Sequence, residues 1–221
     1  MSIKLVIFDL DGTLLDTSEG IKSSVKHVIE KYNLPIPTEN ILNKFIGPPV
    51  QVSFKNLYNL SDEKSSAMAA LFREQYKSVD LFKAKPYDNV VDVLKYLKSN
   101  GVKTAVATYK REDYTKLLLD HFCLSKYLDI ICGSDFDGKL KKKDIIVNAV
   151  NKSGFAINDA IMVGDTVLDA EGASTIGMDF IAALYGFGFK NIKEVSEIQS
   201  VYAIDDIIKI KKVIKNMKEG I

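Results

Sequence analysis

Residues 3–17 read Ile-Lys-Leu-Val-Ile-Phe-Asp-Leu-Asp-Gly-Thr-Leu-Leu-Asp-Thr, and this stretch decides the fold. Its aliphatic run is typical of a buried parallel strand, and the run ends at two carboxylates, Asp9 and Asp11. Gly12 allows the chain to turn sharply just after them. In open α/β sheets, ligands bind at the carboxyl ends of the strands. Because two neighbouring acids repel each other, we expect a cation or a reaction here rather than a plain acidic turn.

Composition narrows the class of protein. The chain has 221 residues, of which 47% are hydrophobic and 27% charged, as in ordinary globular proteins with a full core. A net charge of +1 predicts neither a nucleic-acid partner nor attraction to an acidic membrane. We expect no signal peptide, because the apolar run after Lys4 is short and acids follow at once, and no stretch approaches the roughly 18 apolar residues of a membrane helix. Two cysteines without metal-type spacing, Cys123 and Cys132, favour a reducing cytoplasm.

The residues between Asp16 and Lys85 have a helical pattern. Apolar residues recur at helical spacing over about 21–32, 50–60 and 61–76, and Thr38 can start a further short helix. No strand is predicted within this segment. We therefore predict an inserted all-helical cap domain over residues 16–84. Because it leaves the chain just after the first strand, it is expected to lie over the acidic edge as a lid.

Helices and strands alternate from Pro86 onward. Strands are predicted at 102–108, 129–132, 160–163 and 180–184, with a short edge strand at 201–204 and a helix at 144–152. This alternation predicts an α/β fold with a Rossmann-like, doubly wound, mostly parallel sheet and right-handed crossovers. The predicted catalytic core is discontinuous and consists of residues 1–15 and 85–221.

Further polar residues follow the predicted strands. Thr108 ends one strand, Asp165 ends another with Asp169 four residues later, and Lys143 closes a basic cluster. Each alone has an ordinary explanation as a helix cap or a solvated side chain. The topology, however, brings all of them to the sheet edge that carries Asp9.

These groups fit phosphoryl transfer. Mg²⁺ takes oxygen ligands at about 2.1 Å, and Asp9 and Asp165 could supply two of them. The hydroxyl of Thr108 and the ammonium of Lys143 are suitable donors to a phosphoryl group. A carboxylate can also attack phosphorus and form an aspartyl-phosphate. We therefore expect a Mg²⁺-dependent reaction of a phosphoester.

The order of these motifs resembles the haloacid dehalogenase superfamily, and specifically its phosphatases with a helical cap. Asp9-Leu-Asp11-Gly12-Thr13 is similar to the first motif of that family, and Val106-Ala107-Thr108 to the second. Lys143 corresponds to the third motif, and Gly164-Asp165 with Asp169 to the fourth.

The resemblance implies a role for each matching residue. Asp9 would be the nucleophile, and Asp11 the acid and base that protonates the leaving oxygen and then activates water. Mg²⁺ would be held by Asp9, Asp165 and the backbone carbonyl of Asp11, with Asp169 supporting the metal ligands. Thr108 would bind a phosphoryl oxygen, and Lys143 would bind the phosphate and neutralise the nucleophile.

The choice of lysine depends on alignment. Residues 133–138, Gly-Ser-Asp-Phe-Asp-Gly, are similar to the lead-in of the third motif in phosphoglycolate-phosphatase-like members, which favours Lys143, with Lys142 as the alternative. Two further strings resemble that subgroup, although both could be simple turns. They are residues 45–49, Phe-Ile-Gly-Pro-Pro, and residues 185–188, Tyr-Gly-Phe-Gly.

Several functions remain open within this resemblance. A carboxylic acid at position 11 suits ester hydrolysis and disfavours dehalogenase or phosphonatase chemistry, because an ester oxygen needs a proton. The main prediction is a cytoplasmic phosphatase for a small phosphorylated metabolite, either phosphoglycolate-like or a nucleoside monophosphate. The alternatives are a phosphosugar mutase of the beta-phosphoglucomutase type, an inorganic pyrophosphatase, or a catalytically silent phosphoester-binding protein. A monomer or weak homodimer is expected.

Overall fold

The core of the molecule is a six-stranded parallel sheet. The computed structural model describes residues 3–135, 139–196 and 202–219. The strands, in spatial order, are β5 (Ile130–Ser134), β4 (Lys103–Arg111), β1 (Leu5–Phe8), β6 (Ala160–Gly164), β7 (Asp179–Ala183) and β8 (Tyr202–Ile204). The opening stretch of the sequence thus forms the central strand, with Phe8 paired to Val106 on one side and Val163 on the other. The doubly wound parallel sheet predicted from the sequence is confirmed.

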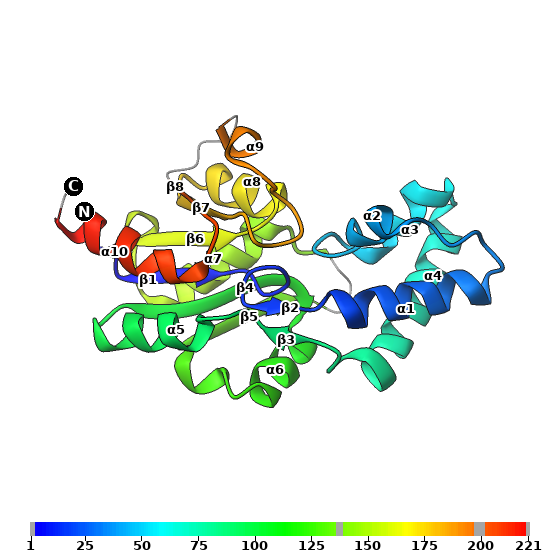
Figure 1. The fold of residues 1–221 in the computed structure, drawn as a ribbon, viewed down its shortest axis with the longest axis horizontal. Helices are drawn as coiled ribbons and strands as arrows, with labels where there is room; N and C mark the ends of the chain where they lie inside the picture. The colour runs from blue at the N-terminus through cyan, green and yellow to red at the C-terminus, as the bar shows by residue number, and fades with distance from the viewer. Residues whose placement is uncertain (1–2, 136–138, 197–201, 220–221) are drawn as a thin grey trace.

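Helices cover both faces of the sheet (Figure 1). Alternate residues of β1 point to opposite faces, so Val6 and Phe8 belong to one apolar cluster and Leu5 and Ile7 to another. The first cluster includes residues of α5 (Val90–Ser99), α6 (Glu112–His121) and α10 (Ile210–Glu219). The second includes residues of α7 (Lys142–Ser153) and α8 (Val167–Thr175). A short helix, α9 (Ile192–Ser196), follows β7.

Four α-helices form a separate group beyond the carboxyl ends of the strands (Figure 1). They are α1 (Ser18–Lys31), α2 (Glu39–Asn43), α3 (Val50–Tyr58) and α4 (Asp62–Gln75), and a π-helical turn (Tyr76–Asp80) follows them. Ser61 caps α4, because its hydroxyl accepts a hydrogen bond from the backbone N–H of Lys64 at 3.2 Å. We refer to these helices and the turn as the cap.

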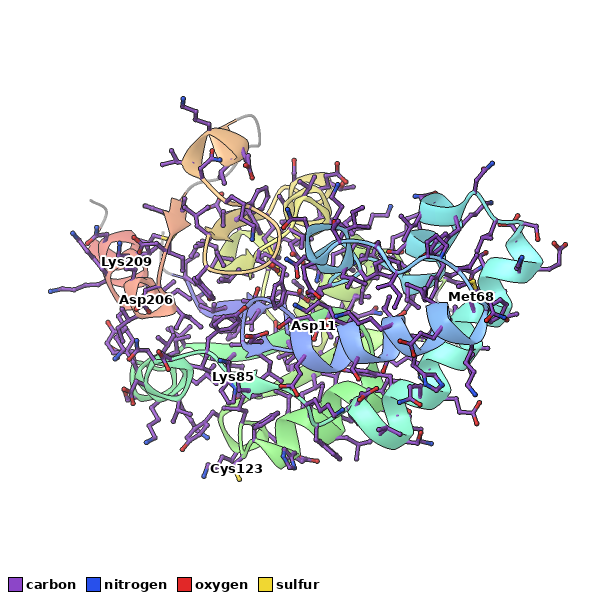
Figure 2. All side chains as sticks on the ribbon, turned by 45° about the vertical axis from the view of Figure 1, so that its right-hand side comes forward. Asp11, Met68, Lys85, Cys123, Asp206 and Lys209 are labelled. Atoms are coloured by element: carbon purple, nitrogen blue, oxygen red, sulfur yellow. The ribbon has the colours of Figure 1, made fainter. Side chains whose placement is uncertain are left out.

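Two very short strands link the cap to the sheet. β2 (Leu15–Asp16) pairs antiparallel with β3 (Lys85–Pro86), so the chain enters and leaves the cap side by side. The sequence did not indicate this pair, because two residues are too short to show a strand period. The predicted boundaries near residues 15 and 85 fall at this pair, and the division into two domains stays a prediction. Figure 2 shows Asp11 at the junction of the cap and the sheet, with Lys85 nearby.

Two element boundaries differ from the predicted ones and matter for the site. β4 continues to Arg111, three residues beyond the predicted end at Thr108, and its pairing with β5 shifts register after Ala107. α7 begins at Lys142, two residues before the predicted start at Asp144. Among the described residues, no helix is both long and apolar enough to cross a lipid bilayer.

Candidate active site

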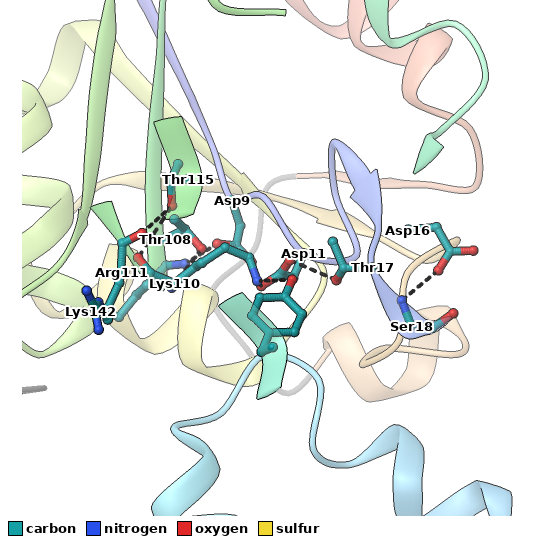
Figure 3. Close-up of polar contacts among 11 residues, drawn as sticks. Asp9, Asp11, Asp16, Thr17, Ser18, Thr108, Lys110, Arg111, Thr115 and Lys142 are labelled. Atoms are coloured by element: carbon teal, nitrogen blue, oxygen red, sulfur yellow. Dashed lines mark hydrogen bonds and ion pairs between the residues drawn. The ribbon is translucent and has the colours of Figure 1, made fainter. Parts of the chain in front are cut away.

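Asp9 lies just past the end of β1 and is almost completely buried. Its Oδ1 atom accepts a hydrogen bond from the ammonium of Lys142 at 2.7 Å (Figure 3). Burial raises the pKa of Asp9 to about 6, and the nearby Lys142 opposes this rise. Among the described residues, only Oδ1 of Asp9 has a hydrogen-bond partner, so the second carboxylate oxygen is available for another contact.

The structure places Lys142, rather than Lys143, against Asp9. The Nζ atom of Lys142 also lies 2.5 Å from Oδ1 of Asp169, so one buried ammonium joins two buried carboxylates. Burial lowers the pKa of Lys142, but Asp169 and then Asp9 outweigh it, so the net shift is upward and the group stays charged. The preference for Lys143 therefore does not fit the geometry.

The reason is the point at which α7 begins. The backbone N–H of Lys141 donates to the carboxylate of Asp144 at 3.0 Å, which caps the helix so that Lys142 is its first residue. The backbone N–H of Lys142 also donates to the hydroxyl of Tyr109 at 2.9 Å. Neighbouring residues of a helix point about 100° apart, so the side chain of Lys143 does not share the direction of Lys142 toward Asp9. Lys143 is half-buried.

Asp165 follows β6 and is fully buried. Its Oδ2 atom accepts hydrogen bonds from the backbone N–H groups of Phe187 at 2.7 Å and Gly188 at 3.2 Å. Its Oδ1 atom is buried and has no hydrogen-bond partner among the described residues. Burial, and then the charges of Asp169 and Asp9, hold the pKa of Asp165 well above its usual range.

Three acids converge at one point below the cap. Carboxylate oxygens of Asp9, Asp165 and Asp169 all lie within 4.8 Å of one another, and all three residues are buried. Three close buried carboxylates with a single ammonium among them leave negative charge uncompensated. A divalent cation with oxygen preference would remove this repulsion and would supply a partner for the unpaired oxygen of Asp165. The residues present therefore fit a Mg²⁺ site.

Asp169 is oriented by its own helix. The backbone N–H and the hydroxyl of Thr166 donate to Oδ2 of Asp169, at 3.0 and 2.6 Å. These contacts leave Oδ1 facing Lys142 and the acidic cluster. The position that the sequence assigns to a supporting residue thus lies directly at the cluster.

Asp11 points away from the three clustered acids and toward the cap. Its Oδ1 atom accepts a hydrogen bond from the hydroxyl of Thr17 at 2.8 Å, and its Oδ2 atom lies 3.1 Å from the ammonium of Lys110 (Figure 3). The sequence expectation assigns only the backbone carbonyl of Asp11 to the metal, and a side chain turned aside is compatible with that. A carboxylate here faces the space in which a leaving group would lie.

Thr108 lies on β4 beside the end of β1. Because Phe8 pairs with Val106, Thr108 falls two residues along β4 from that pair, next to Asp9 (Figure 3). The side chain is buried, and its hydroxyl oxygen accepts a hydrogen bond from the backbone N–H of Lys110 at 3.3 Å. Thr108 does not cap a helix, because α6 begins only after Arg111.

Lys110 was not among the predicted site residues, although its ammonium is held by two other residues of the site. Its buried ammonium contacts Asp11, donates to the hydroxyl of Tyr76 at 3.0 Å and lies 4.7 Å from the centre of that ring. Burial lowers the pKa of Lys110, but Asp11 and Tyr76 outweigh it, and the net shift is upward. Its position two residues after Thr108, on the same strand, was the available sequence signal.

A pocket of about 380 Å³ opens between the cap and the sheet, and Asp11 is one of the residues that line it. The loop of residues 47–49, Gly-Pro-Pro, lines it from the cap, which gives that string a place beside the site. The other string noted in the sequence, residues 185–188, supplies two backbone N–H donors to Asp165. The acids, the lysines and the pocket therefore form one continuous candidate active site.

Comparison with known proteins agrees with this geometry. The family model of haloacid dehalogenase-like hydrolases matches residues 6–183. A 5'-nucleotidase from Pseudomonas aeruginosa is 29% identical over 96% of this chain and 95% of its own length. A phosphoglycolate phosphatase from Aquifex aeolicus is 30% identical over 84% of this chain and 86% of its own length.

Solved structures agree with the sequence comparisons. The crystal structure of a predicted phosphatase from Clostridium acetobutylicum superposes with a TM-score of 0.92 at 36% identity, covering 98% of this chain and 100% of that one. The chain therefore belongs to the haloacid dehalogenase-like hydrolases, as a phosphatase of the phosphoglycolate-phosphatase-like type. The family resemblance and the fold class inferred from the sequence are confirmed.

Proposed function

We propose that this chain is a Mg²⁺-dependent phosphatase that hydrolyses a small phosphate monoester through an aspartyl-phosphate on Asp9. The observation that carries the proposal is the buried cluster of Asp9, Asp165 and Asp169, joined by Lys142 and next to a pocket. Mg²⁺ bound by Asp9, Asp165 and the backbone carbonyl of Asp11 would withdraw negative charge from the phosphoryl oxygens.

The first step forms the intermediate. The free carboxylate oxygen of Asp9 attacks phosphorus, and the bond between phosphorus and the ester oxygen breaks. Lys142 holds the other oxygen of Asp9 at 2.7 Å and so fixes the direction of attack. Protonated Asp11 gives its proton to the leaving oxygen, which departs as an alcohol.

The second step releases the phosphate. Ionised Asp11 now takes a proton from water, whose oxygen attacks phosphorus and displaces the carboxylate of Asp9. The products are inorganic phosphate and the original Asp9. Thr108 donates its hydroxyl to a phosphoryl oxygen in both steps, since its side chain lies buried beside Asp9.

Release of phosphate from p-nitrophenyl phosphate tests the proposal. We expect turnover with Mg²⁺, loss of turnover with a chelator, and no turnover in Asp9→Asn. An acyl phosphate is labile to alkali and hydroxylamine, so the intermediate is trapped by borohydride reduction and located at Asp9 by mass spectrometry. A wild-type chain that releases no phosphate from any ester in the presence of Mg²⁺ contradicts the proposal.

The same assay separates the alternatives. A phosphosugar mutase would need a sugar bisphosphate to start and would release little phosphate, whereas an inorganic pyrophosphatase would prefer pyrophosphate to every ester. A phosphoester-binding protein would bind without turnover. The proposed setting is a reducing cytoplasm, with which the free thiols of Cys123 and Cys132 agree. The monomer or weak homodimer stays a prediction.

A further inference from the structure

The pocket between the cap and the sheet carries a cation that has no partner in the described part of the chain. Arg73, near the end of α4, lines this pocket from the cap and is half-buried. Within the described residues its guanidinium makes no ion pair or hydrogen bond. Taking a guanidinium half out of water without a partner costs free energy, so an anion is expected to approach it.

The other two cations of the pocket are already engaged. Lys110 contacts Asp11 and Tyr76, as described above. The guanidinium of Arg111 lies 2.7 Å from the carboxylate of Asp113 and 4.3 Å from the centre of the Tyr114 ring. Arg73 is therefore the pocket cation whose charge is not used within the described part of the chain.

The cations that line the pocket are Arg73, Lys110 and Arg111. Lys110 is paired with Asp11 and Arg111 with Asp113, so among the described residues Arg73 is the lining cation left to meet an anion. A single carboxylate would match that one guanidinium charge. The planar fork of a guanidinium matches a carboxylate through two parallel hydrogen bonds.

Three of the five aromatic residues that line the pocket, Phe72, Tyr76 and Tyr114, disfavour a stacked base. Tyr76 packs face to face with Phe72, with ring centres 5.5 Å apart at 9°, and also carries the ammonium of Lys110. The ring of Tyr114 lies at 60° to that of Tyr76, with ring centres 6.2 Å apart, and has Arg111 over it. These ring faces contact groups of the protein itself, so they offer little surface on which a nucleobase could stack.

We propose that Arg73 binds a carboxylate on the leaving group and thereby selects short phosphorylated hydroxy acids over neutral phosphoesters and nucleotides. This inference rests on the proposed function. The phosphoryl group would bind at Asp9, Thr108 and Lys142, while the carboxylate would bind Arg73 on the cap side of the pocket. Arg73 is then a specificity-determining residue of the cap.

A matched pair of substrates tests the inference. Phosphoglycolate and 2-hydroxyethyl phosphate have the same length and differ in one group, a carboxylate against a neutral alcohol. We expect wild-type kcat/KM to be at least about tenfold higher for phosphoglycolate, with adenosine monophosphate also below it. Arg73→Gln should lower the phosphoglycolate to 2-hydroxyethyl phosphate ratio roughly 10- to 100-fold, and Arg73→Lys should restore part of it.

The control is Lys77→Gln, since Lys77 is an exposed cation four residues later on the same cap segment. It should leave the ratio unchanged. Thermal unfolding shows whether Arg73→Gln is folded, and should it not fold, Arg73→Lys alone must still lower the ratio. Binding of phosphoglycolate to Asp9→Asn, measured by calorimetry, should weaken when Arg73→Gln is added.

The outcomes separate the two proposals. A chain that hydrolyses esters with the same ratio in wild type and Arg73→Gln overturns the role of Arg73 and leaves the phosphatase proposal standing. Preference for adenosine monophosphate over phosphoglycolate likewise overturns the carboxylate selection alone. No phosphate release from any compound, p-nitrophenyl phosphate included, overturns the proposed function and this inference with it.

Discussion

Single residues at the site are held by opposing charges. Lys142 lies between Asp9 and Asp169, and its ammonium is within 3 Å of a buried carboxylate oxygen of each. Removing one partner of such a buried pair leaves an uncompensated charge, which costs more than the pair itself contributes. Lys142 is therefore expected to be needed for both the charge balance and the direction in which Asp9 points.

Comparison of two neighbouring lysine substitutions checks this assignment. Lys142→Met should lower kcat for p-nitrophenyl phosphate by at least about 100-fold, because it removes the ammonium that contacts Asp9. Lys143→Met should retain close to the wild-type rate, since its side chain points away from the site. Loss of activity in Lys143→Met with an active Lys142→Met would restore the first choice made from the sequence.

Because Asp9 takes up a proton in the fold, the stability of the metal-free protein should depend on pH. The pKa of Asp9 is about 6 in the fold, against an ordinary value of 3.8. The folded protein therefore keeps a proton that the unfolded chain releases, so the free energy of unfolding falls as pH rises from about 4 to 6. In a chelator at pH 8, Asp9→Asn should be more stable than wild type by about 1–3 kcal/mol.

Urea denaturation at several pH values measures this difference. The advantage of Asp9→Asn should shrink toward pH 4, and Glu171→Gln, which changes an exposed carboxylate on α8, should follow the wild type throughout. An Asp9→Asn variant that is less stable at every pH would mean that the contact with Lys142 outweighs the cost of burying Asp9.

At the scale of elements, the turn that follows β1 lies in close contact with Asp165, the residue that follows β6. Gly12 has a φ of +84°, and a Cβ atom there would lie 2.2 Å from Oδ2 of Asp165. The same oxygen accepts the hydrogen bonds from the loop after β7. The absence of a side chain at Gly12 is thus required for Asp165 to reach its position beside Asp9.

Two glycine substitutions separate backbone strain from this contact. Gly154 ends α7 with a φ of +76°, but a Cβ atom there would meet nothing within 4 Å. Gly154→Ala should cost about 1–2 kcal/mol of stability and leave turnover unchanged. Gly12→Ala should cost more and should also abolish Mg²⁺-dependent turnover. Equal losses of stability with retained activity in both variants would show that the contact with Asp165 is not needed.

At the scale of the whole molecule, Lys110 joins the sheet to the cap. It contacts Asp11 on the loop after β1 and Tyr76 at the end of the cap helices. The apolar cluster on this side of the sheet is also continuous with the cap, since it includes Phe8 as well as Phe54 and Met68. The cap is therefore packed on the sheet both by apolar burial and by a buried charge.

A lysine pair tests the contribution of that charge. Lys110→Met should lower the free energy of unfolding by about 3 kcal/mol, because Asp11 is left buried without its cation. Lys116→Met removes an exposed ammonium paired with Glu112 on α6 and should cost at most a few tenths of a kcal/mol. Urea denaturation and the rate of trypsin cleavage near residues 16 and 85 measure both effects. Equal stability of the two variants would contradict the role of Lys110.

The sequence by itself determined the order of strands and helices, the family, and the placement of Asp9, Asp11, Thr108, Asp165 and Asp169 at one edge of the sheet. These features follow from local patterns and from the rule that parallel strands end at the same edge. Confirmed among them are the family and the parallel sheet, while the roles of the site residues remain proposals.

Only the tertiary structure decided which lysine reaches Asp9, that Lys110 bridges Asp11 and Tyr76, and that Arg73 lines the pocket with no side-chain partner among the described residues. A shift of one residue in a helix turns a side chain by about 100°. A run of consecutive lysines does not show which of them will face the site. Contacts between the cap and the sheet join residues tens of positions apart, and no local period records them. Packing selects them, and packing is a property of the folded chain.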